Sequence, residues 1–186
     1  MPNKIIIKKK IINFTKKIRI PGDKSLSIRW VLIASLSSGI SKAQNLLMSE
    51  DVVATIKAIK KLGIKVFYNN QICKIYGAGI DGYKYKKNII INAQNSGTLG
   101  RLIPGLLIDS PEKIKLIGDK SLSKRDFKRI ADPLSKFGAN FTLKKGYGLP
   151  MTFKGPKKLK PVKFIEKKGS AQCKSSVIFA GLKTHG

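Results

Sequence analysis

An internal repeat constrains the fold of this chain more than any other feature. Predicted helices begin at Ser25, Ser96 and Ser170, which are 71 and 74 residues apart. After each of the first two helices, the hydrophobic pattern continues in the same order, with a short extended stretch, a second helix and two strands. Similar segments at a near-constant spacing indicate a repeated supersecondary unit. The sequence therefore predicts an α+β fold made of repeated β-α-β-α-β-β units.

The repeat divides the chain into two complete units, at about 18–87 and 88–156, and a truncated third at 157–186. In the first unit, strands are predicted at 17–20, 41–47, 64–69 and 73–79, and helices at 25–39 and 49–63. In the second unit, strands are predicted at 88–93, 113–118, 140–145 and 149–155, and helices at 96–110 and 121–139. The third begins with a strand at 161–166 and a helix from Ser170.

The hexapeptide GDKSLS occurs twice, at 22–27 and at 118–123. The copies are 96 residues apart, which matches neither spacing of the repeat. The first opens the first helix of its unit, whereas the second opens the second helix of the next unit. The identity is therefore predicted to be local, a strand running into a helix start.

Three helix starts carry small polar residues followed by a basic residue about one turn later. The unpaired N–H groups and the dipole of a helix N-terminus favour an anion there. The alternative is that these residues are ordinary caps and solvated bases. The residues concerned are Lys24, Ser25 and Arg29, then Ser96, Thr98 and Arg101, and finally Ser170, Gln172 and Lys174.

The segment PGDKSLSIR at 21–29 favours the anion interpretation, because it gathers a lysine, two serines and an arginine within about one turn, although it lacks the Walker spacing. Arg125 has two interpretations that the local sequence does not separate: an anion ligand near a helix start, or one of many surface bases.

The net charge of +28, from 38 Lys and Arg against 10 Asp and Glu, has two interpretations. It would attract phosphates, nucleic acid or anionic membranes. Alternatively, a chain rich in Lys, Ile and Asn reflects an AT-rich genome, with lysine filling solvated surface. Because the charge is spread along the chain, it does not identify a function.

The sequence lacks the residue sets that several kinds of catalytic or metal-binding site require. The only histidine, His185, lies at the C-terminal end, so no Ser-His-Asp set can be assembled. No metal-ligand spacing is present, and Cys73 and Cys173 are predicted to be free packing thiols in a reduced compartment. Glu50 and Asp51 are explained by their place in the first turn of a helix, so no acid/base pair is visible.

The first residues, MPNKIIIKKKIINF, lack the continuous apolar run of a signal peptide or a membrane span, because Lys8, Lys9 and Lys10 interrupt them. We therefore expect a cytoplasmic protein with no membrane partner.

Taken in order, the motifs resemble the family of 5-enolpyruvylshikimate 3-phosphate (EPSP) synthases, or 3-phosphoshikimate 1-carboxyvinyltransferases. The resemblance is carried by IRIPGDKSLSIR, SEDV, NSGTLGRL, GDKSLSKRDF, GLPMTFKG and GSAQCKSSVIFAGL. It implies a transferase that moves the enolpyruvyl group of phosphoenolpyruvate to the 5-hydroxyl of shikimate 3-phosphate and releases phosphate. This is a step of the shikimate pathway to chorismate and the aromatic amino acids, and it needs no cofactor and no metal. The implied fold is the inside-out α/β barrel-like domain of enolpyruvyl transferases.

By this resemblance, Lys24 is the catalytic residue and contacts both substrates. The other implied ligands of shikimate 3-phosphate are Ser25, Arg29, Ser170, Ala171 and Gln172. The other implied ligands of phosphoenolpyruvate are Asn95, Gly97, Thr98 and Arg125. The chain departs from the family at Ala171, where some members have serine, and at Asp126, where proline usually follows the arginine. Lys120 and Ser121 are not predicted ligands, despite their identical hexapeptide.

Members of this family are roughly twice as long and fold as two domains, each with three of these units. The resemblance places 1–17 as a strand segment of the second domain and 18–186 in an incomplete upper, substrate-binding domain. The other half carries the acid/base carboxylates, so we expect a fragment that binds substrates without turnover and exposes apolar surface. The full-length protein is expected to be a monomer.

Three alternatives remain. A UDP-N-acetylglucosamine enolpyruvyl transferase is disfavoured by PGDKSLSIR and SAQ, which look more like the shikimate enzyme. A basic nucleic-acid-binding protein agrees with the charge but lacks an aromatic-rich strand for stacking bases, so no nucleic acid is expected as a partner. An inactive remnant is the third.

Overall fold

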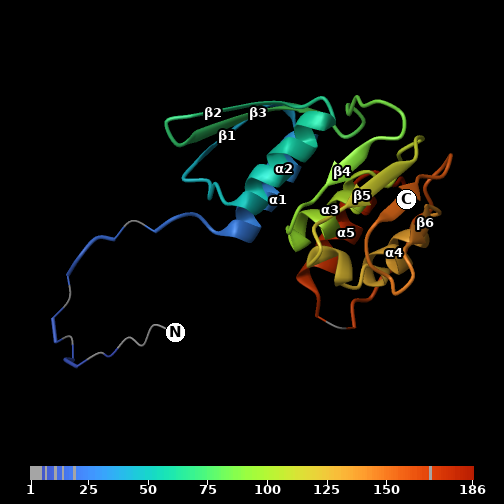
Figure 1. The fold of residues 1–186 in the computed structure, drawn as a ribbon. Coiled ribbons are helices and arrows are strands. Elements are labelled where there is room, and N and C mark those ends of the chain that lie inside the picture. Colours follow the sequence, from blue (N-terminus) through green and yellow to red (C-terminus); the bar gives the residue numbers. More distant parts are fainter. Residues whose placement is uncertain (1–5, 7, 11, 14, 19, 168) are drawn as a thin grey trace.

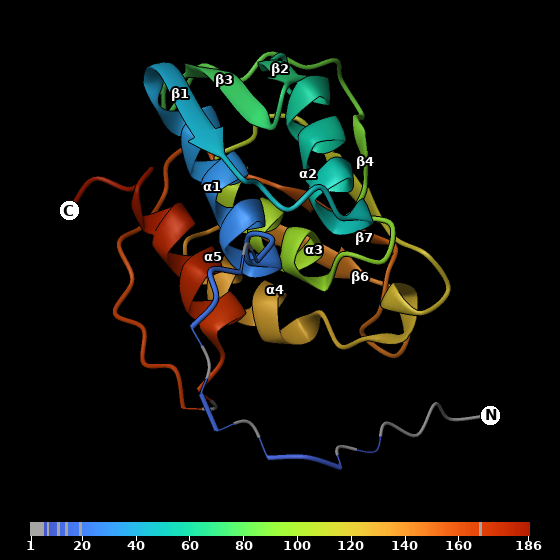
Figure 2. The same cartoon turned by 90° about the vertical axis from the view of Figure 1, so that its left-hand side faces the viewer.

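The structure of the chain is a computed structural model that describes residues 6, 8–10, 12–13, 15–18, 20–167 and 169–186. Figures 1 and 2 show two sheets with helices packed against them. The described residues of 6–22 belong to no helix or strand. The predicted strand at 17–20 is therefore wrong for its described residues Lys17, Ile18 and Ile20; residue 19 lies outside the described residues.

The strands form a three-stranded and a four-stranded sheet. The first has the order β1-β3-β2 and is antiparallel throughout. The second has the order β4-β5-β7-β6, with β4 and β5 parallel and the other pairs antiparallel. The order β1-β3-β2 in the first sheet thus corresponds to the order β5-β7-β6 in the second. The bounds are β1 Ser38–Gln44, β2 Lys65–Asn69, β3 Ile72–Ala78, β4 Ile90–Asn92, β5 Ile114–Ile117, β6 Asn140–Leu143 and β7 Met151–Lys154.

The helices pack beside one another under these sheets. Helix α1 contacts α2 and α3, α3 contacts α5, and α4 contacts both α3 and α5 (Figure 2). The three helices predicted from the repeat therefore adjoin in the order α1, α3, α5. The bounds are α1 Lys24–Leu36, α2 Glu50–Lys61, α3 Gly97–Leu106, α4 Lys128–Ser135 and α5 Ala171–Gly181, with a 3-10 turn, η1, at Leu122–Lys124.

Helix α2 shows why these segments are helical. Val52, Ile56 and Ile59 are buried at the i, i+4, i+7 positions of one face, whereas Lys57 and Lys60 are exposed on the other. Full burial of one such aliphatic side chain stabilises the fold by about 1.5–3 kcal/mol. These side chains belong to a core that also takes in α1, α3 and both sheets. A second, smaller core lies between α4 and α5.

The cap of the first helix lies two residues earlier than the serine spacing predicts. Asp23, not Ser25, is its cap, because the Asp23 carboxylate accepts a hydrogen bond from Leu26 N at 2.7 Å. Ser96 and Ser170 cap α3 and α5 as expected. Counted from cap to cap, the three helices are 73 and 74 residues apart, so the repeat is more regular than the serines suggested.

The single helix predicted at 121–139 is wrong. The chain forms η1, breaks with an extended Arg125 at φ −78° and ψ 149°, and begins α4 at Lys128. Asp126 accepts a hydrogen bond from Lys128 N at 2.8 Å, and this bond starts the new helix. Phe127, directly before α4, is fully buried.

Two other boundaries differ from expectation. Strand β1 already begins at Ser38, where the first helix was expected to continue to Gly39. The segment 161–166 forms no strand, although Val162 and Phe164 pack against the smaller core. The alternation of apolar residues in this segment therefore reflects packing against the smaller core and not pairing with another strand.

Candidate anion-binding site

The two GDKSLS copies fold into the same first turn. Asp23 and Asp119 each accept a hydrogen bond from the leucine N–H three residues on, at 2.7 Å in both copies. Ser27 N and Ser123 N each donate to the carbonyl of the same aspartate, at 2.9 Å in both copies. The identity is therefore a shared helix start, as predicted. The predicted strand precedes only the second copy, where β5 ends at Ile117, because the described residues of 17–22 form no strand. The first copy continues as the long helix α1, whereas the second opens only the 3-10 turn η1.

Lys24, the predicted catalytic residue, begins α1 and is half exposed. Its Nζ lies 3.1 Å from Asp51 Oδ2, in the first turn of α2. The side chain is 52% exposed and its partner 18%. The structure thus pairs Lys24 with a carboxylate that the sequence explained only by its place at the start of a helix.

Arg29 links α1 to α5. Its Nε donates to Ser175 Oγ at 3.2 Å, and its Nη1 donates to the carbonyl of Ser25 at 3.3 Å. Ser175 in turn donates to the carbonyl of Ala171 at 2.8 Å. Ser175, which carries no local signal in the sequence, therefore joins two predicted ligands from different repeats, Arg29 and Ala171.

Gln172 links α5 to α3. Its Nε2 donates to Thr98 Oγ1 at 3.0 Å, and its Oε1 accepts from Arg101 Nη1 at 2.5 Å. Ser170, which precedes α5, uses its hydroxyl to accept from Cys173 N at 3.2 Å. Two predicted ligands, Thr98 and Gln172, are thus in direct contact, and Arg101, which was not a predicted ligand, takes part in it.

Arg125 reaches the first turn of α3. A methyl group on Gly97 would lie 2.8 Å from Arg125 Nη1, so the guanidinium covers the face of this residue. Asn95 lies nearby in sequence but points elsewhere, because its Nδ2 donates to Asp119 Oδ2 at 2.6 Å. Asp119 therefore serves both as the cap of the second hexapeptide and as the partner of a predicted ligand.

The site is strongly positive. The pKa of the half-buried Arg101 guanidinium is lowered, first by burial and then by the positive charges of Arg129 and Arg125, while Asp126 partly opposes these effects. The N-terminus of α3 adds its own positive end. Such a place favours a bound anion of more than one charge.

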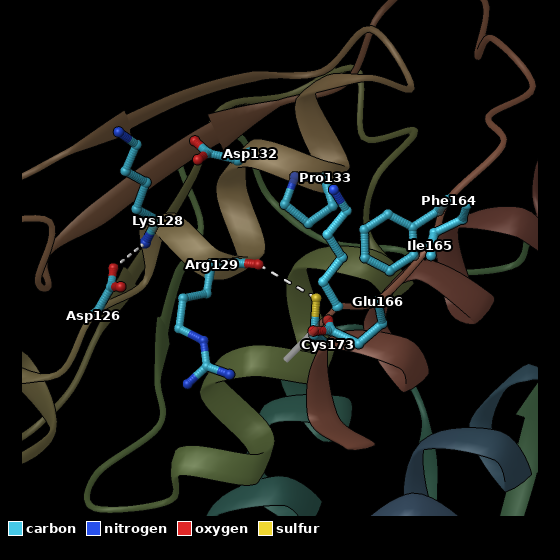
Figure 3. A pocket seen from close by; sticks show the side chains of 10 residues that line it. Asp126, Lys128, Arg129, Asp132, Pro133, Phe164, Ile165, Glu166 and Cys173 are labelled. Carbon is cyan, nitrogen blue, oxygen red and sulfur yellow. Dashed lines mark hydrogen bonds between the residues drawn. The ribbon is translucent and has the colours of Figure 1, made fainter. Parts of the chain in front are cut away.

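A cavity of about 400 Å³ lies beside this site, between α4 and residues 164–167 (Figure 3). None of the predicted ligands lines it. The Cys173 thiol on its wall has a pKa raised to about 12, first by burial and then by the adjacent Glu166. A thiol held neutral in this way agrees with its predicted packing role.

No group of three or more His, Cys, Asp or Glu side chains among the described residues is placed to hold a metal ion. No helix among them is both long and apolar enough to cross a membrane.

Comparison with known proteins decides the family. The family model described as EPSP synthase (3-phosphoshikimate 1-carboxyvinyltransferase) matches residues 8–186. The chain belongs to the EPSP synthase family. The resemblance seen in the motifs is thereby confirmed, and the family match favours it over the UDP-N-acetylglucosamine enolpyruvyl transferase and nucleic-acid-binding alternatives.

The relatives of this EPSP synthase family chain are considerably longer than it is. A 3-phosphoshikimate 1-carboxyvinyltransferase of Streptococcus agalactiae serotype Ia is 42% identical over 170 residues, which are 91% of this chain and 40% of the relative. One from Desulforamulus reducens is 40% identical over 182 residues, 95% of this chain and 42% of the relative. The solved EPSP synthase from Acinetobacter baumannii matches with a TM-score of 0.86 and 33% identity, over 92% of this chain and 39% of that one. The chain spans about 40% of the length of these curated relatives.

Proposed function

We propose that this chain forms the part of an EPSP synthase active site that binds shikimate 3-phosphate and the phosphate end of phosphoenolpyruvate. The observation that carries the proposal is the direct joining of three helix starts, α1 to α5 through Arg29 and α5 to α3 through Gln172. Helix starts with unpaired N–H groups suit phosphates, and their joining suits a ligand that touches several of them.

The proposed ligands are those that the resemblance implies. Lys24, Ser25, Arg29, Ser170, Ala171 and Gln172 would hold shikimate 3-phosphate; Lys24, Asn95, Gly97, Thr98 and Arg125 would hold phosphoenolpyruvate. The ammonium of Lys24 would leave Asp51 for the substrate anions. Arg125 and the first turn of α3 would stabilise the phosphate that leaves when the enolpyruvyl group is transferred.

We further propose that the acid/base carboxylates lie in the part of the relatives that this chain does not cover. The strand order β1-β3-β2 corresponds to β5-β7-β6, which supports repeat units at about 18–87 and 88–156, although the described residues of the first unit contain no counterpart of β4. In the same proposal, 157–186 would begin a third unit and 1–17 would belong to a second domain. The complete enzyme would be a cytoplasmic monomer. This chain alone would bind substrate without releasing phosphate.

Isothermal titration of the purified 186-residue chain with shikimate 3-phosphate tests this proposal. We expect saturable binding that Arg29→Gln weakens about tenfold or more, because a charge-assisted hydrogen bond to the ligand is lost. The matched control is Lys57→Gln, which removes the same charge from an exposed position in the middle of α2.

Two results would overturn the proposal. One is no saturable binding by the unsubstituted chain, and the other is equal weakening by Arg29→Gln and Lys57→Gln. A phosphate-release assay with both substrates tests the remaining part, since steady turnover by this chain alone would contradict a binding half-site.

A further inference from the structure

Three arginines from three different elements gather at the start of α3. Arg101 lies one turn into α3, Arg125 between η1 and α4, and Arg129 in α4. The position of a methyl group on Gly97 would be 2.8 Å from Arg125 Nη1 and 3.5 Å from Arg101 Nη1. These two guanidinium groups therefore flank the same small patch of backbone at the first residue of α3.

Arg129 lies on α4, which packs against α3. Its backbone carbonyl accepts a hydrogen bond from Cys173, the residue after the Gln172 that bonds Arg101. In agreement with this placement, the positive charge of Arg129 helps to lower the pKa of Arg101. Like charges held this close in a partly desolvated place repel one another. The arrangement therefore costs free energy unless something compensates it.

The ion pairs that the structure shows among the described residues do not compensate this repulsion, because they all involve lysine, and the negative charge of Asp126 opposes it only in part. Arg101 has neutral neighbours, the Gln172 carboxamide and the Phe127 ring, whose centroid is 5.9 Å from Arg101 Cζ. These contacts give Arg101 a structural role of its own. They do not explain why Arg129 lies beside it.

Among the described residues, the guanidinium of Arg129 makes no comparable contact. The hydrogen bond that Figure 3 draws at this residue is made by its backbone carbonyl, which accepts from Cys173 Sγ at 3.4 Å. The side chain leaves α4 in a different direction from Lys128 and Asp132 in the same view. Arg129 is exposed and free to turn its planar fork toward a ligand.

We propose that Arg129 completes, with Arg101 and Arg125, a three-guanidinium site for a dianionic phosphate group at the start of α3. This inference rests on the proposed function and deepens it, because it adds Arg101 and Arg129 to the ligands of the phosphate that Arg125 would clamp. Planar guanidinium groups suit a phosphate better than ammonium groups do, since each can donate two parallel hydrogen bonds.

The test uses inorganic phosphate as the probe and the full 186-residue chain as the protein. Phosphate binding is followed by 31P nuclear magnetic resonance at low ionic strength. We expect Arg129→Gln to weaken it about tenfold. Arg129→Lys should restore part of the loss, because it keeps the charge but not the fork.

Lys128→Gln is the matched control, since it removes the same charge from the next residue, whose Nζ lies over the Tyr147 ring at 4.7 Å. Thermal unfolding of each variant shows whether the fold is retained. A loss in Arg129→Gln no larger than in Lys128→Gln overturns the inference, and so does the absence of any phosphate binding by the unsubstituted chain.

The inference and the proposed function can fail separately. If phosphate binds through Arg129 but shikimate 3-phosphate does not bind, the inference stands and the proposed function fails. If both ligands bind and Arg129→Gln affects neither, only the inference fails.

Discussion

Gly97 sets the space that is available at the start of α3. It is buried, and a methyl group there would lie 2.8 Å from Arg125 Nη1, closer than a methyl group and a nitrogen can approach. The obstacle is the end of a flexible side chain, so the arginine can move away at little cost in stability. Gly97→Ala should therefore leave the fold intact and displace the guanidinium from the anion.

We predict that Gly97→Ala weakens phosphoenolpyruvate or phosphate binding about tenfold, with a free energy of unfolding within about 0.5 kcal/mol of the unsubstituted chain. Titration calorimetry and urea unfolding measure the two quantities. Gly181→Ala is the control, because a methyl group at Gly181 meets no atom within 4 Å. Equal binding by both variants would show that Arg125 does not use this space.

At the scale of single elements, the two hexapeptide copies show how strongly an aspartate cap directs the chain. Asp23 is exposed and receives the Leu26 N–H, one of the unpaired donors at the start of α1. Asp23→Ala should lower the free energy of unfolding by about 1 kcal/mol, because this donor loses its acceptor.

Asp23→Asn supplies the control for that prediction, since an asparagine oxygen accepts the same bond and caps about as well. Urea unfolding of the two variants, followed by circular dichroism, gives the difference. If Asp23→Asn destabilises the chain as much as Asp23→Ala, the carboxylate acts through its charge on the helix dipole and not as a hydrogen-bond cap.

Hydrophobic periodicity predicted α1, α2, α3 and α5 and most strands. It is clearest in α2, which buries one regular face, whereas α3 is buried on nearly all sides. Periodicity failed where a local hydrogen bond, or packing alone, determined the conformation of the backbone. Asp126 starts a new helix within 121–139, while Phe127 is drawn into the core. At 161–166, Val162 and Phe164 alternate like strand residues, yet they pack on the smaller core without a strand partner.

The sequence predicted the separate helix starts of the candidate site but not the contacts between them. The motifs named Thr98 and Gln172, but their 3.0 Å hydrogen bond joins residues 74 positions apart and depends on how α3 packs against α5. Ser175 and Arg129 carried no local signal at all. Their relevance arises from packing between repeats, which one repeat considered alone does not contain.

At the scale of the whole molecule, α1 and α5 expose apolar side chains along their shared boundary. Ile33 lies one turn beyond Arg29 on α1 and is 55% exposed; Ile178 lies nearly one turn beyond Ser175 on α5 and is 62% exposed. Because Arg29 bonds to Ser175, the parts of α1 and α5 that carry the two isoleucines adjoin. Leu26 and Leu182 extend the same strip, at 68% and 52% exposed.

We predict that this strip makes the chain associate as its concentration rises, in spite of a net charge of +28. Ile178→Lys should reduce the association, because it places a charge in the strip without disturbing a buried contact. Light scattering over a concentration series measures the change. Ile40→Lys, at a 56% exposed position on β1, makes the same substitution away from the strip and should have little effect. If both variants reduce association equally, added charge and not the α1–α5 strip governs the solubility of the chain.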